Sequence, residues 1–327
     1  MERRGPTAAA ARERSRPRSG DQYELRHGTA SAVIASVGAS LREYRDDDRD
    51  LVVPYPADVV RPAYRGATLV PWPNRVIGGE YAFEGAVRRL DLSEPERGHA
   101  LHGLGAWRSW ELVEADAEAV SLRLLLEPTL GYPWRLEITT TFVLGADGLT
   151  QRVHAANLDD APAPYGTAPH PYLVAGPAPL ESWSLEVPAG RVQLVETTSL
   201  TPVGIAGVDE GDGELDFRTA RSIGSTSIDH AFTDLRRDER GVASVVVTDP
   251  QSGTGVRMSW DEQCPWVQVH TADLPSGDRA LGHRIGLAVE PMTCAPGAMD
   301  ERREHVGPIT VLAPGDDHTA SWTLAPA

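Results

Sequence analysis

Short runs in which apolar and polar residues alternate constrain the fold of this chain more than any other feature. Residues 119–128 read AVSLRLLLEP and residues 134–144 read WRLEITTTFVL, with Leu125 as the exception in the first run. Because successive side chains of a strand point to opposite faces, the pattern predicts strands with one face on a core. Similar runs cover residues 149–157, 183–187, 243–248, 255–260, 266–271, 309–312 and 318–324.

Turn signals separate these runs, and the chain contains no convincing long amphipathic helix. The signals are residues 78–79 (GG), 146–148 (ADG), 159–162 (DDAP), 249–250 (DP) and 314–316 (PGD). Each supplies a positive φ, a fixed φ or a side-chain cap that a strand does not easily continue through. Many short strands without helices favour an antiparallel sandwich or barrel over a parallel α/β sheet. We therefore predict an all-β protein, with one large antiparallel sandwich domain over residues 21–327.

The charge and the cysteine content of the chain indicate which kinds of partner it can bind and in which compartment it lies. The net charge of −16 argues against nucleic acid or an anionic membrane as a partner, because both bind positive surfaces. No apolar run reaches the roughly 18 residues that predict a membrane-spanning helix. Two cysteines, Cys264 and Cys294, argue against a disulfide framework and favour a reducing compartment. These features predict a cytoplasmic protein.

The first 20 residues differ in composition from the rest of the chain. Residues 1–20 are rich in Arg, Ala, Pro and Ser and lack the apolar stretch of a secretion signal. Such a composition predicts a disordered tail. A start codon assigned too early and a functional basic arm are the other interpretations.

Five clusters of polar and aromatic residues lie far apart in the chain. They are residues 71–75 (PWPNR), 99–103 (HALHG), 169–172 (PHPY), 227–230 (SIDH) and 289–292 (VEPM). Arg, His and carboxylate side chains beside aromatic rings suit a pocket that hydrogen-bonds a polyhydroxylated ligand and moves protons on it. His170 lies between two prolines that restrict its backbone. Glu290 ends an apolar run, which predicts a buried strand and a raised carboxyl pKa.

In this order the clusters resemble the aldose 1-epimerase family, also called galactose mutarotase-like proteins. The resemblance covers residues 25–325. Its segments are 71–75 with Gly78, Tyr81, Phe83 and Gly85; 101–103 (LHG); 170–172 (HPY); 228–229 (ID) with Phe232; 267–271 (VQVHT); and 287–291 (LAVEP). It implies a β-supersandwich with a sugar cleft and a reaction, without cofactor or metal, that interconverts the α and β anomers of a free aldose. The implied partner is a monosaccharide, and we expect a monomer or homodimer.

Interconverting anomers requires opening of a hemiacetal ring. One group removes the C1 hydroxyl proton while another protonates the ring oxygen, and the roles reverse after rotation about C1–C2. The resemblance makes Glu290 the base and His170 the acid, a role that suits the ordinary pKa of histidine. The residues that it places on the sugar are Arg75, His102, Asp229, Asn74 and Gln268.

Some positions depart from the common family pattern. His270 stands where many members carry Tyr, and Pro169 precedes His170 where another His is frequent. Segment 101–103 with Trp107 and Trp110 is closer to a bacterial subgroup, some of whose members resemble enzymes that act on sulfonated glucose, the sulfoquinovose mutarotases.

A sulfonated substrate needs a cation, and a neutral hexose is the alternative. Arg75 or Arg284 could bind a sulfonate bidentately. Trp72, Trp107 and Trp266 are candidates for stacking on an apolar sugar face, although large aromatic side chains more often belong to the core.

Other interpretations of these residues remain open. Asp229 and Glu290 could be the carboxylate pair of a glycoside hydrolase, or the fold could serve a noncatalytic sugar-binding protein. Arg75 could form a structural ion pair, Asp229 could cap a turn and Gln268 could simply line a strand. His99 and His102 have the i,i+3 spacing of a metal pair, but the sequence offers no paired Cys or nearby His cluster to complete a zinc site.

Overall fold

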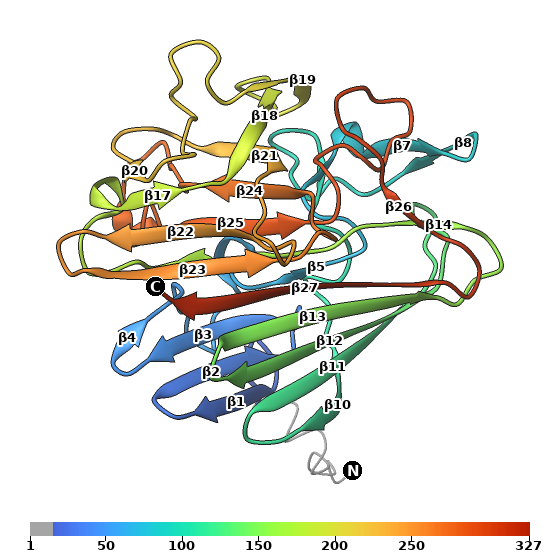
Figure 1. The fold of residues 1–327 in the computed structure, drawn as a ribbon. Helices are drawn as coiled ribbons and strands as arrows, with labels where there is room; N and C mark the ends of the chain where they lie inside the picture. The colour runs from blue at the N-terminus through green and yellow to red at the C-terminus, as the bar shows by residue number, and fades with distance from the viewer. Residues whose placement is uncertain (1–15) are drawn as a thin grey trace, which may run out of the picture.

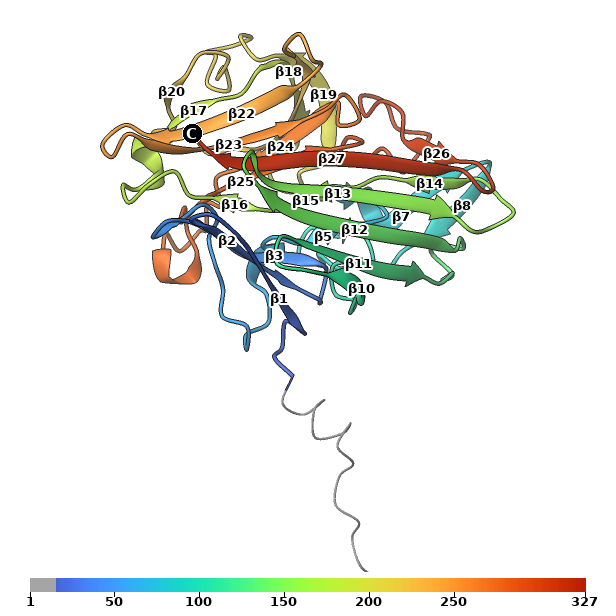
Figure 2. The same cartoon turned by 60° about the horizontal axis from the view of Figure 1, so that its bottom comes forward.

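The computed structural model describes residues 16–327, which form an all-β fold (Figure 1). Its largest sheet has nine antiparallel strands in the order β10-β11-β12-β13-β27-β23-β22-β17-β20. Their bounds are Glu111–Ala115 (β10), Ala119–Leu126 (β11), Leu136–Gly145 (β12), Gly148–Asn157 (β13), Asp317–Pro326 (β27), Thr254–Trp260 (β23), Ala243–Asp249 (β22), Ser184–Glu186 (β17) and Arg221–Ser222 (β20). Figure 2 shows β27, β13, β12 and β11 side by side along the length of the molecule.

A second sheet has six antiparallel strands in the order β16-β25-β24-β21-β18-β19. The strands are Tyr172–Leu173 (β16), Leu287–Met292 (β25), Trp266–His270 (β24), Asp229–Leu235 (β21), Ala189–Val195 (β18) and Pro202–Gly207 (β19). Every residue of β25 is buried. A strand covered on both faces carries a continuous apolar run instead of an alternating one, which explains the sequence that precedes Glu290.

The remaining strands form one four-stranded sheet and four two-stranded pairs. The four-stranded sheet contains Gln22–His27 (β1), Ala30–Ala35 (β2), Ser40–Asp46 (β3) and Arg49–Asp50 (β4). The pairs are Thr68–Leu69 (β5) with Ala168–Pro169 (β15), Arg75–Val76 (β6) with Ala100–Leu101 (β9), Glu80–Phe83 (β7) with Ala86–Arg89 (β8), and Ala163–Tyr165 (β14) with Thr310–Leu312 (β26). In the described residues helix is limited to four 3-10 turns: Pro62–Tyr64 (η1), Ile77–Gly79 (η2), Leu180–Ser182 (η3) and Arg279–Leu281 (η4).

The prediction of an all-β sandwich without long helices is confirmed. Along β12 the burial alternates as expected, with Leu136, Ile138, Phe142 and Leu144 fully buried. Leu125, the exception to the alternation, is 45% exposed on the outer face of β11. Strand geometry therefore overrides the apolar character of that side chain.

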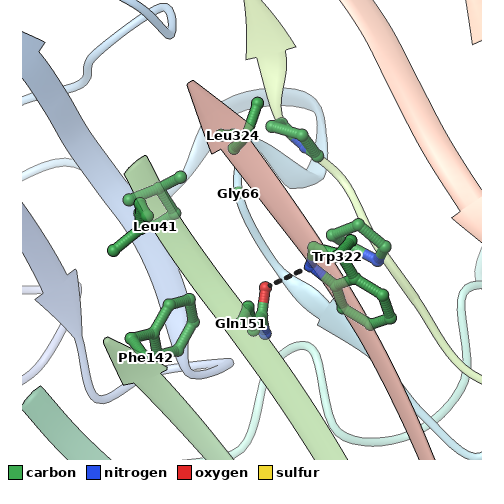
Figure 3. Close-up of a pocket in the computed structure, with 9 residues that line it drawn as sticks. Leu41, Gly66, Phe142, Gln151, Trp322 and Leu324 are labelled. Atoms are coloured by element: carbon green, nitrogen blue, oxygen red, sulfur yellow. Dashed lines mark hydrogen bonds between the residues drawn. The ribbon is translucent and has the colours of Figure 1, made fainter. Parts of the chain in front are cut away.

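A small, mostly apolar cavity lies between the nine-stranded sheet and the segment that carries His170 (Figure 3). It is lined by Leu41, Gly66, Phe142, Leu149, Gln151, Pro169, Pro171, Trp322 and Leu324. Trp322 Nε1 donates to Gln151 Oε1 at 3.0 Å beside it. Pro169 and Pro171 face this interior, so the alternation of an extended chain turns the intervening His170 side chain the other way.

The domain is in contact with residues that we expected to belong to the N-terminal tail. Ser19 is buried, and its hydroxyl donates to the carbonyl oxygen of Ala57 at 2.9 Å. Arg16 forms an ion pair with Asp21 at 2.9 Å. The rest of the predicted tail, residues 1–15, lies outside the described residues. In the described part of the chain no helix is long and apolar enough to cross a membrane.

Candidate active site

His170 lies between β15 and β16, with an almost fully buried side chain. Its carbonyl oxygen accepts a hydrogen bond of 2.7 Å from the Gly66 amide. Its ring stacks on Tyr172, with ring centroids 5.3 Å apart, and lies 6.3 Å from the ring of Tyr64. The flanking prolines, the backbone hydrogen bond and two aromatic neighbours thus fix the orientation of the imidazole.

Glu290 projects from the buried strand β25 towards His170. Its Oε1 atom lies 3.4 Å from His170 Nε2, and its side chain is 2% exposed. Glu290 Oε2 and His170 Nδ1 are buried without a hydrogen-bond partner in the described structure. Unpartnered polar atoms in a dry site are costly, which makes this pair a candidate for contact with a ligand or an ordered water.

His102 joins the pair from the turn after β9. Its ring centroid lies 4.9 Å from that of His170 and 4.7 Å from that of Tyr64. Its Nδ1 atom accepts a hydrogen bond of 3.2 Å from the backbone N–H of Asn74. An accepting Nδ1 places the proton of a neutral ring on Nε2, so His102 can offer an N–H donor on its other side.

Arg75 starts β6, next to Asn74, and forms the structural ion pair that the sequence left open as an alternative, with Glu94 as a partner that the sequence did not name. Its Nε and Nη2 donate to the two carboxylate oxygens of Glu94 at 2.7 and 2.9 Å. Its Nη1 lies 3.3 Å from Asn74 Oδ1. Glu94 also accepts from Arg97 at 2.7 Å. The Nε and Nη2 donors of Arg75 are therefore occupied by Glu94. The positive charge of Arg75 still acts on Asp229 and Glu290.

Asp229, Gln268 and His270 form a second polar group on the same sheet. In the strand register Asp229 pairs with His270 and Gln268 pairs with Glu290. Gln268 Nε2 donates to Asp229 Oδ1 at 2.6 Å, and His270 Nδ1 lies 3.7 Å from that same oxygen. About a quarter of each of the Asp229 and His270 side chains is exposed (26% and 28%). This group therefore reaches solvent more than the buried His170–Glu290 pair does.

Burial shifts the pKa values of the carboxyl and imidazole groups in this cluster in opposite directions. It raises the pKa of Glu290 well above the ordinary range, helped by the negative charge of Asp229. It lowers the pKa of His170 to about 3, with a further contribution from His270, and it lowers the pKa of His102 well below the ordinary value. Asp229 behaves differently: burial opposes its charge, but His270, Arg75 and Gln268 hold its pKa below the usual range. A paired set of raised and lowered pKa values is typical of an acid–base site.

All seven predicted site residues are therefore found around one cluster. The sequence matches the aldose 1-epimerase family over residues 21–324. The chain belongs to this family.

Individual relatives agree with that assignment. The chain is 35% identical to the uncharacterized protein YihR of Escherichia coli strain K12, over 86% of this chain and 87% of that protein. Its fold is similar to a GalM/aldose epimerase homologue from C. elegans (TM-score 0.80, 20% identity, 94% of this chain and 98% of the other). It is also similar to a galactose 1-epimerase from Lactobacillus acidophilus NCFM (TM-score 0.75, 17% identity, 93% of each chain). The architecture is thus the galactose mutarotase-like β-supersandwich.

A metal ion is a poor fit to this cluster, although its residue types suggest one. One ligand atom each of His102, His170 and Glu290 lies within 4.8 Å of the others. However, the Asn74 amide donates to His102 Nδ1, so Nε2 of the neutral ring carries the proton and has no lone pair for a metal. His99 is not a ligand partner, because its two ring nitrogens contact the Gly78 amide and the Ser199 carbonyl.

Other candidates from the sequence have structural roles. The Arg284 guanidinium binds Asp273 at 2.8 Å and the carbonyls of Thr226 and Gly224. Trp72 and Trp266 are buried in the core, at 2% and 7% exposure. Of the three candidate Trp residues, Trp107 alone is accessible, at 49% exposure, and its ring lies 5.2 Å from that of Tyr64.

Sequence reasoning missed Glu94, Tyr64 and two arginines near the cluster. Arg61 is buried, donates to backbone carbonyls and lies over the Trp107 ring at 4.6 Å. Arg65 lies 5.9 Å from the Tyr172 ring, and among the described residues it has no ion-pair partner; its Nε is buried and unpartnered. Nothing local in the sequence marks these residues, since their roles depend on contacts between distant segments.

Proposed function

We propose that this protein is a cofactor-independent aldose 1-epimerase that interconverts the anomers of a free aldose. The observation that carries the proposal is the buried pair of Glu290 and His170, with facing atoms 3.4 Å apart. Glu290 takes the proton of the C1 hydroxyl while His170 protonates the ring oxygen, and the C1–O5 bond breaks. Rotation about C1–C2 and the reverse proton transfers close the ring on the other face.

The pKa shifts of the pair act on the ring-opening step. Ring opening converts ionised Glu290 and protonated His170 into protonated Glu290 and neutral His170, with the total number of protons unchanged. The raised pKa of Glu290 and the lowered pKa of His170 both favour the second arrangement. That arrangement is also the resting state of the free site, so binding of the cyclic sugar must first move the proton from Glu290 to His170. The shifts then favour the ring-opening step, which returns the proton to Glu290.

The surrounding residues provide contacts for sugar hydroxyls. His102 offers its Nε2 proton as a neutral donor, because Asn74 occupies Nδ1. Asp229 is an acceptor at the more exposed side, oriented by Gln268. Tyr64 and the accessible Trp107 present aromatic faces of the kind on which sugar rings stack.

For the substrate we propose an aldose, and Arg65 supports one that carries an anionic group such as a sulfonate. Arg75 and Arg284 are already paired with carboxylates. Arg65 has no such partner among residues 16–327, and it lies against Tyr172, which stacks on His170. A half-buried cation without a counter-ion favours an anionic ligand.

Saturation-transfer NMR of anomer exchange tests the proposal. The panel comprises glucose, galactose, xylose, fucose and sulfoquinovose, each measured against the buffer rate. Exchange above that rate for at least one sugar is the expected result. A preference for sulfoquinovose that Arg65→Gln removes, with neutral sugars unaffected, supports the anionic substrate. No acceleration for any sugar by folded protein contradicts the enzyme assignment and favours the noncatalytic sugar-binding alternative.

The glycoside hydrolase alternative is tested separately with chromogenic glycosides. A mutarotase leaves them intact, whereas a hydrolase that uses Asp229 and Glu290 releases the chromophore. We further propose that the protein is cytoplasmic and is a monomer or homodimer, which size-exclusion chromatography with light scattering tests. Its proposed partner is a monosaccharide, with no metal and no nucleic-acid or membrane partner.

A further inference from the structure

We infer that Glu94 is a positioning residue: it fixes the Arg75 guanidinium beside the catalytic pair and offsets part of the charge of that cation. The inference rests on the proposed function for its effect on rate. Both side chains are buried, at 9% exposure for Arg75 and 5% for Glu94, and two parallel N–H···O bonds join them. Bidentate pairs of this kind fix geometry as well as charge.

The backbone holds Glu94 rigidly with respect to the site. Its amide donates to the His99 carbonyl at 3.0 Å, and its own carbonyl accepts from the Gly98 amide at 2.9 Å. The chain then continues into β9, where Leu101 pairs with Arg75. One short turn therefore fixes Glu94, Arg75 and His102 relative to one another.

The charge of Arg75 has to be offset in part because the groups near it titrate. The charged and titratable groups that act on the His170–Glu290 pair or its neighbours are Arg75, Asp229, Arg61, His102, His270, Arg65 and Tyr172. An unpaired Arg75 would be attracted to the carboxylate of Glu290 and would stabilise its ionised form. A carboxylate held in that way is a weaker base.

Glu94→Gln preserves the shape of the side chain and removes its charge. We expect kcat/KM for anomer exchange to fall by about 10–100-fold. We also expect both limbs of the pH–kcat/KM profile to move to lower pH, because an added positive potential makes each proton harder to bind. Glu94→Asp restores the charge and should return the limbs to higher pH, with only partial recovery of the rate.

Arg97→Gln is the matched control. Arg97 is 36% exposed and contacts the same carboxylate at 2.7 Å from the outside. Its loss removes an ion pair of Glu94 without freeing Arg75, so we expect kcat/KM within twofold of wild type and unchanged pH limbs. Equal effects of the two substitutions, or a loss of rate in Glu94→Gln without a shift of either limb, would overturn the inference.

A readout that does not need turnover separates this inference from the proposed function. The Arg75 Nε–H proton should exchange slowly with solvent in ¹⁵N-resolved NMR spectra of wild type and Arg97→Gln, and fast in Glu94→Gln. Absence of anomer exchange in wild type with this pattern intact rejects the proposed function but keeps the positioning of Arg75. Fast exchange in wild type rejects the positioning itself.

Discussion

At the scale of single residues, burial reverses the order in which the carboxyl of Glu290 and the imidazole of His170 bind protons. Burial raises the pKa of Glu290, as its apolar strand predicted, but the ordinary pKa that we expected for His170 is wrong, because burial lowers it to about 3. His102 is kept neutral by burial and by the Asn74 amide on its ring. The cluster thus contains a donor that stays uncharged and a pair that can exchange protons.

Glu290→Gln should lower kcat for anomer exchange by about 10²–10⁴-fold with little change in KM, because an amide keeps the shape but accepts no proton. His170→Asn should have a similar effect. Exchange NMR at several sugar concentrations measures both parameters, and circular dichroism checks that the variants fold. Wild-type turnover in the Gln variant would remove Glu290 from the base role.

Buried His170 should also make the folded state sensitive to acid. Its pKa is about 3 in the folded protein and near 6.5 when unfolded, so the unfolded chain binds the proton first as the pH falls. This group's contribution to stability is therefore present above pH 6.5 and is lost below it. Between pH 7 and 5 the loss is about 1–2 kcal/mol.

Urea unfolding of wild type and His170→Asn at both pH values measures this contribution. The variant should lose less stability between pH 7 and 5 than wild type does. His102 remains in the variant and provides the residual acid sensitivity. An equal loss in both proteins would show that His170 is not neutral in the folded state.

At the scale of elements, the turn that follows β9 depends on a glycine. Gly103 has a φ of +73°, and a Cβ atom there would lie 2.1 Å from the Val70 carbonyl oxygen. Gly98, on the other side of β9, has almost the same φ of +74° and open space around it. An alanine at either position would therefore be strained by the positive φ, but only at Gly103 would its Cβ atom also clash with a neighbouring atom.

Gly98→Ala should cost about 1 kcal/mol of unfolding free energy. Gly103→Ala should cost about 2–4 kcal/mol and lower the exchange rate, since the backbone that positions His102 must move. Denaturant unfolding compares the stabilities, and exchange NMR compares the rates. Equal costs at the two sites would mean that the turn accommodates the methyl group.

At the scale of the whole molecule, the sheets are joined by a few specific contacts besides the core. The Tyr44 hydroxyl on β3 donates to the Leu324 carbonyl on β27 at 3.3 Å. At the N-terminus, Ser19 binds Ala57, and Arg16 binds Ser109 at 3.0 Å. We therefore propose that the fold starts before residue 21, where the composition of the chain suggested a boundary.

Two truncations test where the fold begins. Removal of residues 1–20 deletes the Ser19 and Arg16 contacts, and we expect Tm to fall by about 2–4 °C for each kcal/mol lost. Removal of residues 1–15 retains those contacts and should leave Tm within about 1 °C of the full chain. Both variants should keep wild-type kcat. Differential scanning calorimetry decides, and equal Tm values in the two truncations would assign no role to residues 16–20.

Much of the architecture was predictable because it depends on patterns among neighbouring residues. Alternation marks β12 and β27 within a few residues of their ends, and an apolar run marks β25, since side-chain direction within a strand depends on the backbone alone. The family segments likewise identified the residues that surround the His170–Glu290 pair. These are properties of neighbouring positions, and the sequence by itself determines them.

Only the tertiary structure decided which side chains meet. Three features depend on contacts that no local pattern records: the Glu94 partner of Arg75, the Asp273 partner of Arg284, and the lack of an ion-pair partner for Arg65 within residues 16–327. The lowered pKa of His170 follows from burial among segments far apart in the chain, whereas the raised pKa of Glu290 was already expected from its apolar strand. The physical reason is that strand patterning acts over a few bonds, whereas ion pairing and desolvation act through space between segments that the fold brings together.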